Sequence, residues 1–308
     1  MLGASCVLAS LATLGATARA AVTTSLHGFS QDTCGVKIDG VMNMGIHAVP
    51  VTDHISSSGT TSDASIVFTP STNSPQLLAW VNEALGGHNS VRNIQVPTLD
   101  SAYKDTTIET INKVSIVEVD FPVLSASTSN AFAYLTVKLT PNAASSSVAG
   151  SHTVQGAPTS IADKALLANW FKLEIDGLDL RFAKSVNAFA VTTPMNVPTA
   201  EARRAETAPN MIVTKALTSS VSAQNVVFSV AMNPAQYQPI AAWVSSGGAA
   251  KAGSIQYLSP VGTTTTVNTI CVLSFASMTP VRINANNATQ IADVEVRVSG
   301  LKLTCPGI

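Results

Sequence analysis

Apolar and polar residues alternate with a period of two along several stretches of the chain. Alternation of this kind, with many β-branched residues, is typical of strands that bury one face. The stretches that show it are residues 114–121, 133–139, 171–175 and 292–298. The chain is therefore predicted to be mainly β.

Two short segments have helical spacing instead. In residues 75–85 the apolar positions recur along one face of a helix, and residues 239–244 repeat a shorter form of the pattern. A Gly-Gly pair follows each segment and is expected to end the helix. Trp80 and Trp243 lie in these apolar stripes, so we expect them to pack in the core rather than to stack on a ligand.

The strand and helix patterns recur in the same order in the two halves of the chain. The matched segments are 36–41 with 173–178, 66–68 with 226–228, 77–81 with 240–244, 94–95 with 255–256, 122–123 with 280–281, and 133–139 with 292–298. One short match would be chance, but six in order indicate a duplicated domain of about 125–145 residues per copy.

These matches predict the organisation of the chain. The predicted parts are an apolar N-terminal segment (1–24), a first β domain (25–141), a linker rich in Ala, Ser and Gly (142–160), and a second β domain (161–308). The spacing between copies grows from 137 residues at the Ile-Asp-Gly pair to 163 at the Trp pair, which predicts a 26-residue insertion within residues 192–220. Strands around one short helix fit a small barrel or sandwich in each domain.

The N-terminal segment leaves two interpretations open. Its apolar part, residues 2–14, is too short to span a bilayer but fits the core of a secretion signal, and Ala18-Arg19-Ala20 fits a cleavage site. No Lys or Arg precedes Arg19, which favours a retained Ala-rich arm. No other segment is apolar for long enough to cross a membrane.

The four cysteines are Cys6, Cys34, Cys271 and Cys305. None forms a C-x-x-C pair, so the sequence does not predict a zinc site. Free, buried thiols are the default expectation. A Cys34–Cys305 or a Cys271–Cys305 bridge remains open, because spacing alone does not define connectivity.

Composition and charge exclude several classes of protein. Charged residues make up only 11%, and 17 Lys+Arg against 18 Asp+Glu give a net charge of -1. A sequence-specific nucleic-acid interface needs a basic patch, which this balance does not favour. Apolar residues reach 46%, which argues against disorder. A β-rich surface with so few charges is expected to be covered by neighbouring subunits.

Candidate chemistry is scarce. The histidines are His27, His47, His54, His88 and His152. They lack metal-ligand spacing and are interpreted as solvated loop residues. Asp39 and Asp176 recur in both copies, but each precedes a Gly at a strand end and is explained by a turn. Neither a nucleophile elbow nor a phosphate-binding loop is present. We therefore expect no enzyme activity, and we assign no catalytic, cofactor-binding or metal-binding residue.

The second copy resembles a known family. Residues 170–178, Trp-Phe-Lys-Leu-Glu-Ile-Asp-Gly-Leu, and then 182–186 resemble the opening of contractile-phage tail tube proteins, and they are also similar to the Hcp-type tubes of type VI secretion. The Trp helix and the closing strand pair (278–303) resemble the family as well. The resemblance covers most of residues 30–140 and 165–304. Cys34-Gly35 replaces the aromatic strand in the first copy, and the chain has two domains where a usual tube subunit has one.

The resemblance implies two tandem small β-barrels, each with one short helix, that act as a structural subunit of a phage tail tube or a tail-like injection tube. Its partners would be further copies, as hexamers or trimers, together with sheath and baseplate-type proteins. DNA would pass through the lumen without sequence recognition, and no membrane would be involved. The location would be a virion tail. Two alternatives are a trimeric hub with a pseudo-hexameric ring and a secreted two-domain β binding module.

Overall fold

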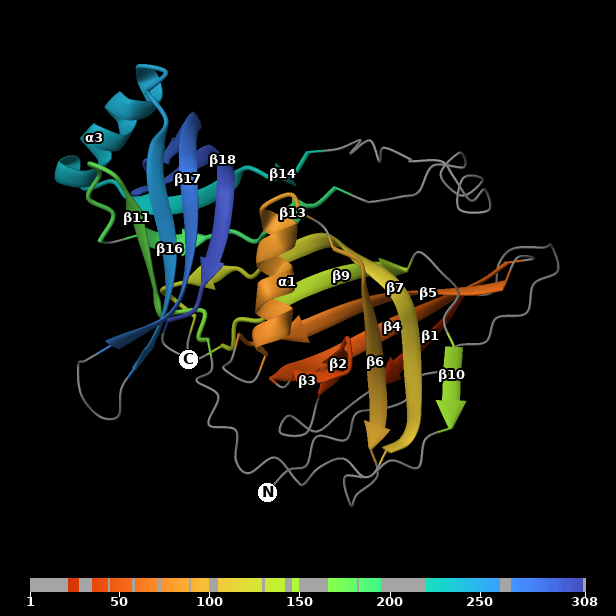
Figure 1. Cartoon of the computed structure of the whole chain (residues 1–308). Helices are drawn as coiled ribbons and strands as arrows, with labels where there is room; N and C mark the ends of the chain where they lie inside the picture. The colour runs from red at the N-terminus through yellow and green to blue at the C-terminus, as the bar shows by residue number, and fades with distance from the viewer. Residues whose placement is uncertain are drawn as a thin grey trace, which may run out of the picture.

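The computed structural model describes residues 22–27, 35–43, 45–56, 59–70, 74–88, 90–99, 105–128, 131–141, 146–149, 166–181, 183–194, 220–260 and 267–306. This part of the chain is mainly β, with two helices, as the alternation predicts (Figure 1). The elements are β1 (Val22–His27), β2 (Val36–Ile38), β3 (Val41–Asn43), β4 (Ile46–Ser56), β5 (Gly59–Phe68), α1 (Pro75–Leu85), β6 (Arg92–Leu99), β7 (Asp105–Phe121), β8 (Leu124–Ser125), β9 (Leu135–Pro141), β10 (Ser146–Ala149), β11 (Phe171–Ile175), β12 (Ala183–Val186), β13 (Phe189–Thr192), β14 (Ser222–Ala223), β15 (Val226–Ala231), α3 (Pro234–Ser245), β16 (Lys251–Pro260), β17 (Val267–Asn286) and β18 (Ile291–Thr304).

The strands form two sheets. The first has 11 strands, with the main order β1-β4-β5-β9-β7-β6-β2-β3, and it curls into a half-barrel (Figure 1). The second has seven strands in the order β11-β16-β17-β18-β15-β12-β8. All pairings within both sheets are antiparallel.

The two sheets share one strand order. The path β2-β6-β7-β9-β5-β4 in the first sheet parallels the path β11-β16-β17-β18-β15-β12 in the second, and sequence matches join β2 to β11, β6 to β16, β9 to β18 and β5 to β15. The register agrees as well: Phe68 lies opposite Leu135 in the first sheet, and the matched Phe228 lies opposite Val294 in the second. The sequence duplication therefore corresponds to a repeated topology.

Two of the matches do not hold in space. Pro122-Val123 follows the end of β7, whereas Pro280-Val281 lies inside β17. Gly87 and Gly247 are equivalent positions in the two copies, since both have positive φ (83° and 61°) and each follows the last turn of its helix. Trp80 therefore corresponds to Ile240, and Trp243 lies three positions, almost one turn, closer to the end of its helix.

Both tryptophans nevertheless pack in the core, as predicted. Trp80 is 0% exposed and Trp243 is 6% exposed. Each indole N–H donates to a backbone carbonyl just beyond the helix, Trp80 to Ser90 at 2.9 Å and Trp243 to Ala249 at 3.0 Å. Positions three apart lie on the same helix face, so the tryptophan can shift by almost one turn and keep this role.

Asparagine side chains cap the start of both helices. Buried Asn43, at the end of β3, accepts the Leu77 N–H at 3.1 Å and thereby satisfies a free donor of the first turn of α1. In α3, Asn233 accepts the Ala235 N–H at 3.0 Å. This cap and Pro234 start α3 five residues before the predicted start at Pro239, which lies inside the helix.

Several predicted parts lie outside the described residues. These are residues 1–21 of the N-terminal segment, Cys6, Cys34, His152, residues 150–160 of the linker, and residues 195–219 of the insertion. Within the predicted linker, Ser146–Ala149 forms β10 on β7 instead of a flexible connection. His27, His47 and His54 lie in strands rather than in loops, which corrects the expectation for them.

Candidate functional site

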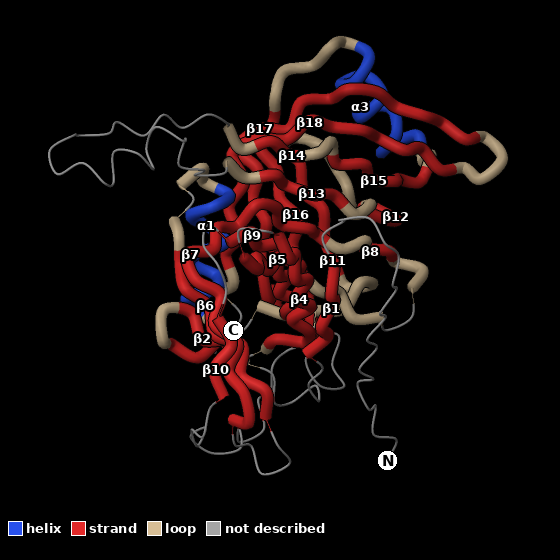
Figure 2. The backbone as a smooth tube through the Cα atoms, turned by 90° about the vertical axis from the view of Figure 1, so that its right-hand side faces the viewer, coloured by secondary structure: helices blue, strands red, loops and turns tan. Residues whose placement is uncertain are grey.

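The two halves of the chain meet through exchanged strands. β13, from the second half, pairs with the end of β7, and β8, from the first half, pairs with β12. The partner numbers follow one register throughout, so residues 118–125 and 185–192 form a single antiparallel ribbon interrupted near Pro122. Each half thus completes the sheet of the other (Figures 1 and 2).

Aromatic packing continues across this ribbon. The rings of Phe121 and Phe189 are stacked with centroids 4.8 Å apart, and Phe189 lies 6.3 Å from Phe275. Phe121 belongs to the first half and the other two rings belong to the second. The buried apolar residues of both halves therefore form one contiguous core.

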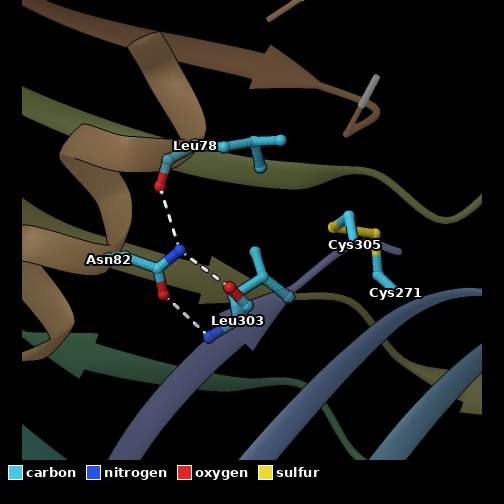
Figure 3. The surroundings of a disulfide bond; sticks show 5 residues. All are labelled: Leu78, Asn82, Cys271, Leu303 and Cys305. Carbon is cyan, nitrogen blue, oxygen red and sulfur yellow. Dashed lines mark hydrogen bonds between the residues drawn. A yellow bond between two sulfur atoms is a disulfide. The ribbon is translucent and has the colours of Figure 1, made fainter. Parts of the chain in front are cut away.

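Asn82 of α1 joins the helix to the edge of β18. Its Oδ1 accepts the Leu303 N–H at 2.9 Å, and its Nδ2 donates to the Leu303 carbonyl at 2.7 Å (Figure 3). The side-chain amide thus takes the place of the backbone of a neighbouring strand. Nδ2 also donates to the Leu78 carbonyl at 3.2 Å, which fixes the amide orientation.

A disulfide bond lies beside this contact (Figure 3). Cys271 of β17 bonds to Cys305, which directly follows β18, and the bridge closes a separation of 34 residues. The expectation of free thiols is wrong for these two residues, because β17 and β18 pair in a register that brings them face to face. Of the two bridges left open by the sequence, the structure contains Cys271–Cys305.

A groove of about 410 Å³ lies at the same junction. Its walls come from the end of α1, the two ends of the segment 194–220, and the bend of β18 around Gly300. Small and apolar side chains dominate it, namely residues 85–87, 194, 220, 221, 223 and 298–301. Such a lining offers shape and backbone groups to an apolar ligand, but none of the titratable side chains that acid–base catalysis requires.

Charged groups on the first sheet neutralise one another. Lys138 of β9 binds Glu118 and lies 3.1 Å from Asp120, both on β7. The Lys138 hydrogen bond lowers the pKa of Glu118, whereas burial raises the pKa of Asp120. In the second sheet, hydrogen bonds from Asn225 and Arg282 lower the pKa of Glu295. These faces are polar, and the charged side chains named here lie in ion pairs.

The Asp-Gly turns are held by cations from the next strand. Asp39 and Gly40 have φ of 48° and 82°, as a two-residue hairpin turn requires, so the predicted turn role is confirmed. Asp39 also accepts from Arg92, at 3.1 Å, and from the Asn93 N–H, at 3.0 Å. In the second half, Lys251 donates to the Asp176 carbonyl at 2.8 Å. Sequence reasoning missed both cations, although each is the first residue of its strand.

Arg92 also binds Glu83 of α1, at 3.0 Å, and so connects the helix to the β2–β3 turn. Burial alone would lower the pKa of Arg92, but hydrogen bonds to Asp39 and Glu83 outweigh it and raise the pKa. Within the described ranges, no group of three His, Cys, Asp or Glu side chains could hold a metal ion. Neither described helix is long and apolar enough to cross a membrane.

Fold and junction together define a class: a mainly β protein whose two topologically alike sheets are joined by exchanged strands. No protein-family model matches the chain, and no curated protein matches its sequence.

Proposed function

We propose that the protein is a structural, non-catalytic subunit of a phage tail tube or a tail-like injection tube, whose copies assemble into stacked rings. The observation that carries the proposal is the ribbon of residues 118–125 with 185–192. This ribbon joins two topologically alike units through different surfaces of each. Contacts between unlike surfaces generate rings when they close and filaments when they do not.

A duplicated chain allows two kinds of ring. Three chains would supply six units and form a pseudo-hexameric ring, as a hub at the end of a tube requires. Six chains would instead stack two layers of six units, so that one chain spans two ring heights. In each case the two units, completed as small β-barrels, surround a lumen that DNA crosses without sequence recognition, and sheath and baseplate-type proteins bind outside.

The neutral faces of the sheets support stacking. On several strands, oppositely charged side chains pair with each other, as Lys172 and Glu174 do on β11 and Arg282 and Glu295 do between β17 and β18. Such faces can approach one another without the desolvation of unpaired charges. This arrangement agrees with a charged fraction of only 11%.

Electron microscopy of the purified full-length chain tests the proposal. We expect rings or tubes whose projection has six-fold or pseudo-six-fold symmetry, together with concentration-dependent sedimentation. The number of chains in a ring, measured by native mass spectrometry, distinguishes the trimer from the hexamer. A monomer that persists at high concentration would count decisively against a tube subunit.

The disulfide favours a second candidate, a secreted two-domain β binding module. Disulfides persist mainly in oxidising compartments, and the chain contains the Cys271–Cys305 bond as well as an apolar groove that could receive a ligand. The mature N-terminus of the exported protein tests this alternative. A start at Ala21 supports secretion with signal removal, whereas an intact Met1 in an assembled particle supports the tube.

A further inference from the structure

Each of the two strands that form the ribbon has a matching strand in the other half of the chain. These two matching strands do not pair with each other within the chain. Residues 118–124 of the ribbon's acceptor correspond to residues 279–286 of β17, because Val119 and Pro280 lie opposite the matched Val137 and Val296 and β17 has one extra residue between Pro280 and Arg282. Residues 186–192 of the ribbon's donor correspond to residues 46–53 of β4, because Ile46 and Val186 lie opposite the matched Phe68 and Phe228 and β4 has one extra residue between Ile46 and Ala48.

The counterpart acceptor is open. β16 pairs with β17 only as far as Met278, and β17 continues with β18 as far as Asn286. Among the described strands, none pairs with residues 279–286 on the side away from β18. In the first half the same edge of β7 is the one that β13 occupies. An edge of this kind is a template for another strand.

The counterpart donor is covered by the N-terminal strand. β1 pairs antiparallel with residues 49–54 of β4, on the side of β4 away from β5. In the second half, β13 uses the matching side to bind β7. β1 therefore occupies the position that a second unit would take, and residues 46–48 remain beside it without a described partner strand on that side.

We propose that residues 279–286 of β17 pair antiparallel with residues 46–53 of β4 in a second copy of this chain and displace β1. The inference rests on the proposed function, to which it adds the contacting strands. The new ribbon between two chains repeats the contact between the two halves of one chain. Successive halves, within a chain and between chains, would therefore be joined by the same kind of contact. β1 then acts as a removable cover that keeps β4 paired until a neighbour arrives.

A register shift in β17 is compatible with this assignment. Its pairing with β18 shifts register between Pro280 and Arg282, and edge strands often use such bulges and prolines to prevent pairing. However, β7 has a register shift of the same kind between Ile116 and Glu118, directly before the residues that bind β13. A register shift near the edge of β7 therefore does not prevent β13 from pairing there.

Lysine substitutions on the open edge test the acceptor. Asn284→Lys with Asn286→Lys places two charges on an exposed part of β17, and charged edges resist pairing. We expect loss of rings by microscopy and a monomer by sedimentation. The unfolding transition should change only slightly, because the two hydrogen bonds lost from Asn286 lie in an exposed turn. Asn287→Lys is the matched control, because it makes the same change in the turn just beyond the strand and should assemble as the wild type does.

A reversible lock tests the cover. Thr24 and Thr52 lie opposite each other, so Thr24→Cys with Thr52→Cys can fix β1 on β4 when oxidised. We expect the oxidised variant to remain monomeric and to assemble once reductant is added. The wild type and Thr24→Cys alone, given the same treatments, control for the native disulfide.

The outcomes separate this inference from the proposed function. If the wild type forms rings while both the lysine pair and the oxidised lock also form them, the strand assignment is overturned and the tube proposal stands. If the wild type never assembles, the tube proposal fails, and the strand assignment fails with it.

Discussion

Asn82 has no distinguishing feature in the sequence, yet its amide supplies two hydrogen bonds to Leu303, which is 221 residues away. Asn43 is similar, since it is fully buried and caps a helix that starts 32 residues later. Both residues bind backbone groups near the end of an element. Residues with such long-range roles have no local pattern by which a sequence could reveal them.

Replacing Asn82 tests the first of these roles. Asn82→Ala leaves the Leu303 N–H and carbonyl without partners, and each unsatisfied buried group costs about 1–3 kcal/mol. We expect the free energy of unfolding, measured in urea, to fall by about 2 kcal/mol. Asn287→Ala, in an exposed turn, should change it by less than about 0.5 kcal/mol. Equal effects of the two changes would show that the junction contact does not contribute.

The Glu118–Lys138 pair should make stability depend on pH. Folding lowers the pKa of Glu118, so the carboxylate stabilises the folded chain above its unfolded pKa, and this contribution is lost as the pH falls through the lower folded value. Because the pair is partly exposed, Glu118→Gln should cost at most about 1 kcal/mol at pH 7. Urea unfolding should show the difference vanish in strong acid. A difference that persists there would indicate lost packing instead.

At the scale of elements, local periodicity predicts a large part of the fold. It gives α1 and β11 their observed bounds, because both depend on residues close in sequence. The Trp match was wrong by almost one turn, since a helix keeps its buried face when its sequence shifts by three positions. Strand exchange at the junction could not be predicted, because pairing between distant strands depends on register and leaves no local signal.

The Cys271–Cys305 bond fixes the end of the last strand, so its loss should weaken the whole chain. A cross-link that closes 34 residues stabilises by roughly 2–4 kcal/mol through the unfolded state. We expect Cys305→Ser to lose about that amount in urea unfolding, and reductant should bring the wild type to the same level. Unchanged wild-type stability in reductant, with thiols that react under oxidising conditions, would contradict the bond.

At the scale of the molecule, the junction makes the halves interdependent. The contiguous core draws Phe121 from one half and Phe189 from the other, and each sheet is extended by strands of its neighbour. The two repeats of topology therefore share one interior. Sequence matches revealed the repeats, whereas the shared interior required the three-dimensional pairing.

Expression of the separate halves measures this interdependence. Residues 1–141 lack β13 on the edge of β7, and residues 161–308 lack β8 beside β12. We expect neither fragment to unfold cooperatively when followed by circular dichroism, while the full chain unfolds in one transition. The mixed fragments should recover part of the native signal. A half that unfolds cooperatively alone would contradict the shared core.

The order of synthesis gives the exchanged strands a further consequence. The end of β7 leaves the ribosome about 70 residues before β13, an interval of about 4–14 seconds at ordinary elongation rates. Once β10 has also emerged, the first sheet lacks only β13 and β14. Neighbouring ribosomes on the same message carry chains with the same open edge. We therefore expect the spacing of ribosomes, as well as the final protein concentration, to affect whether β13 joins its own β7 or that of another nascent chain.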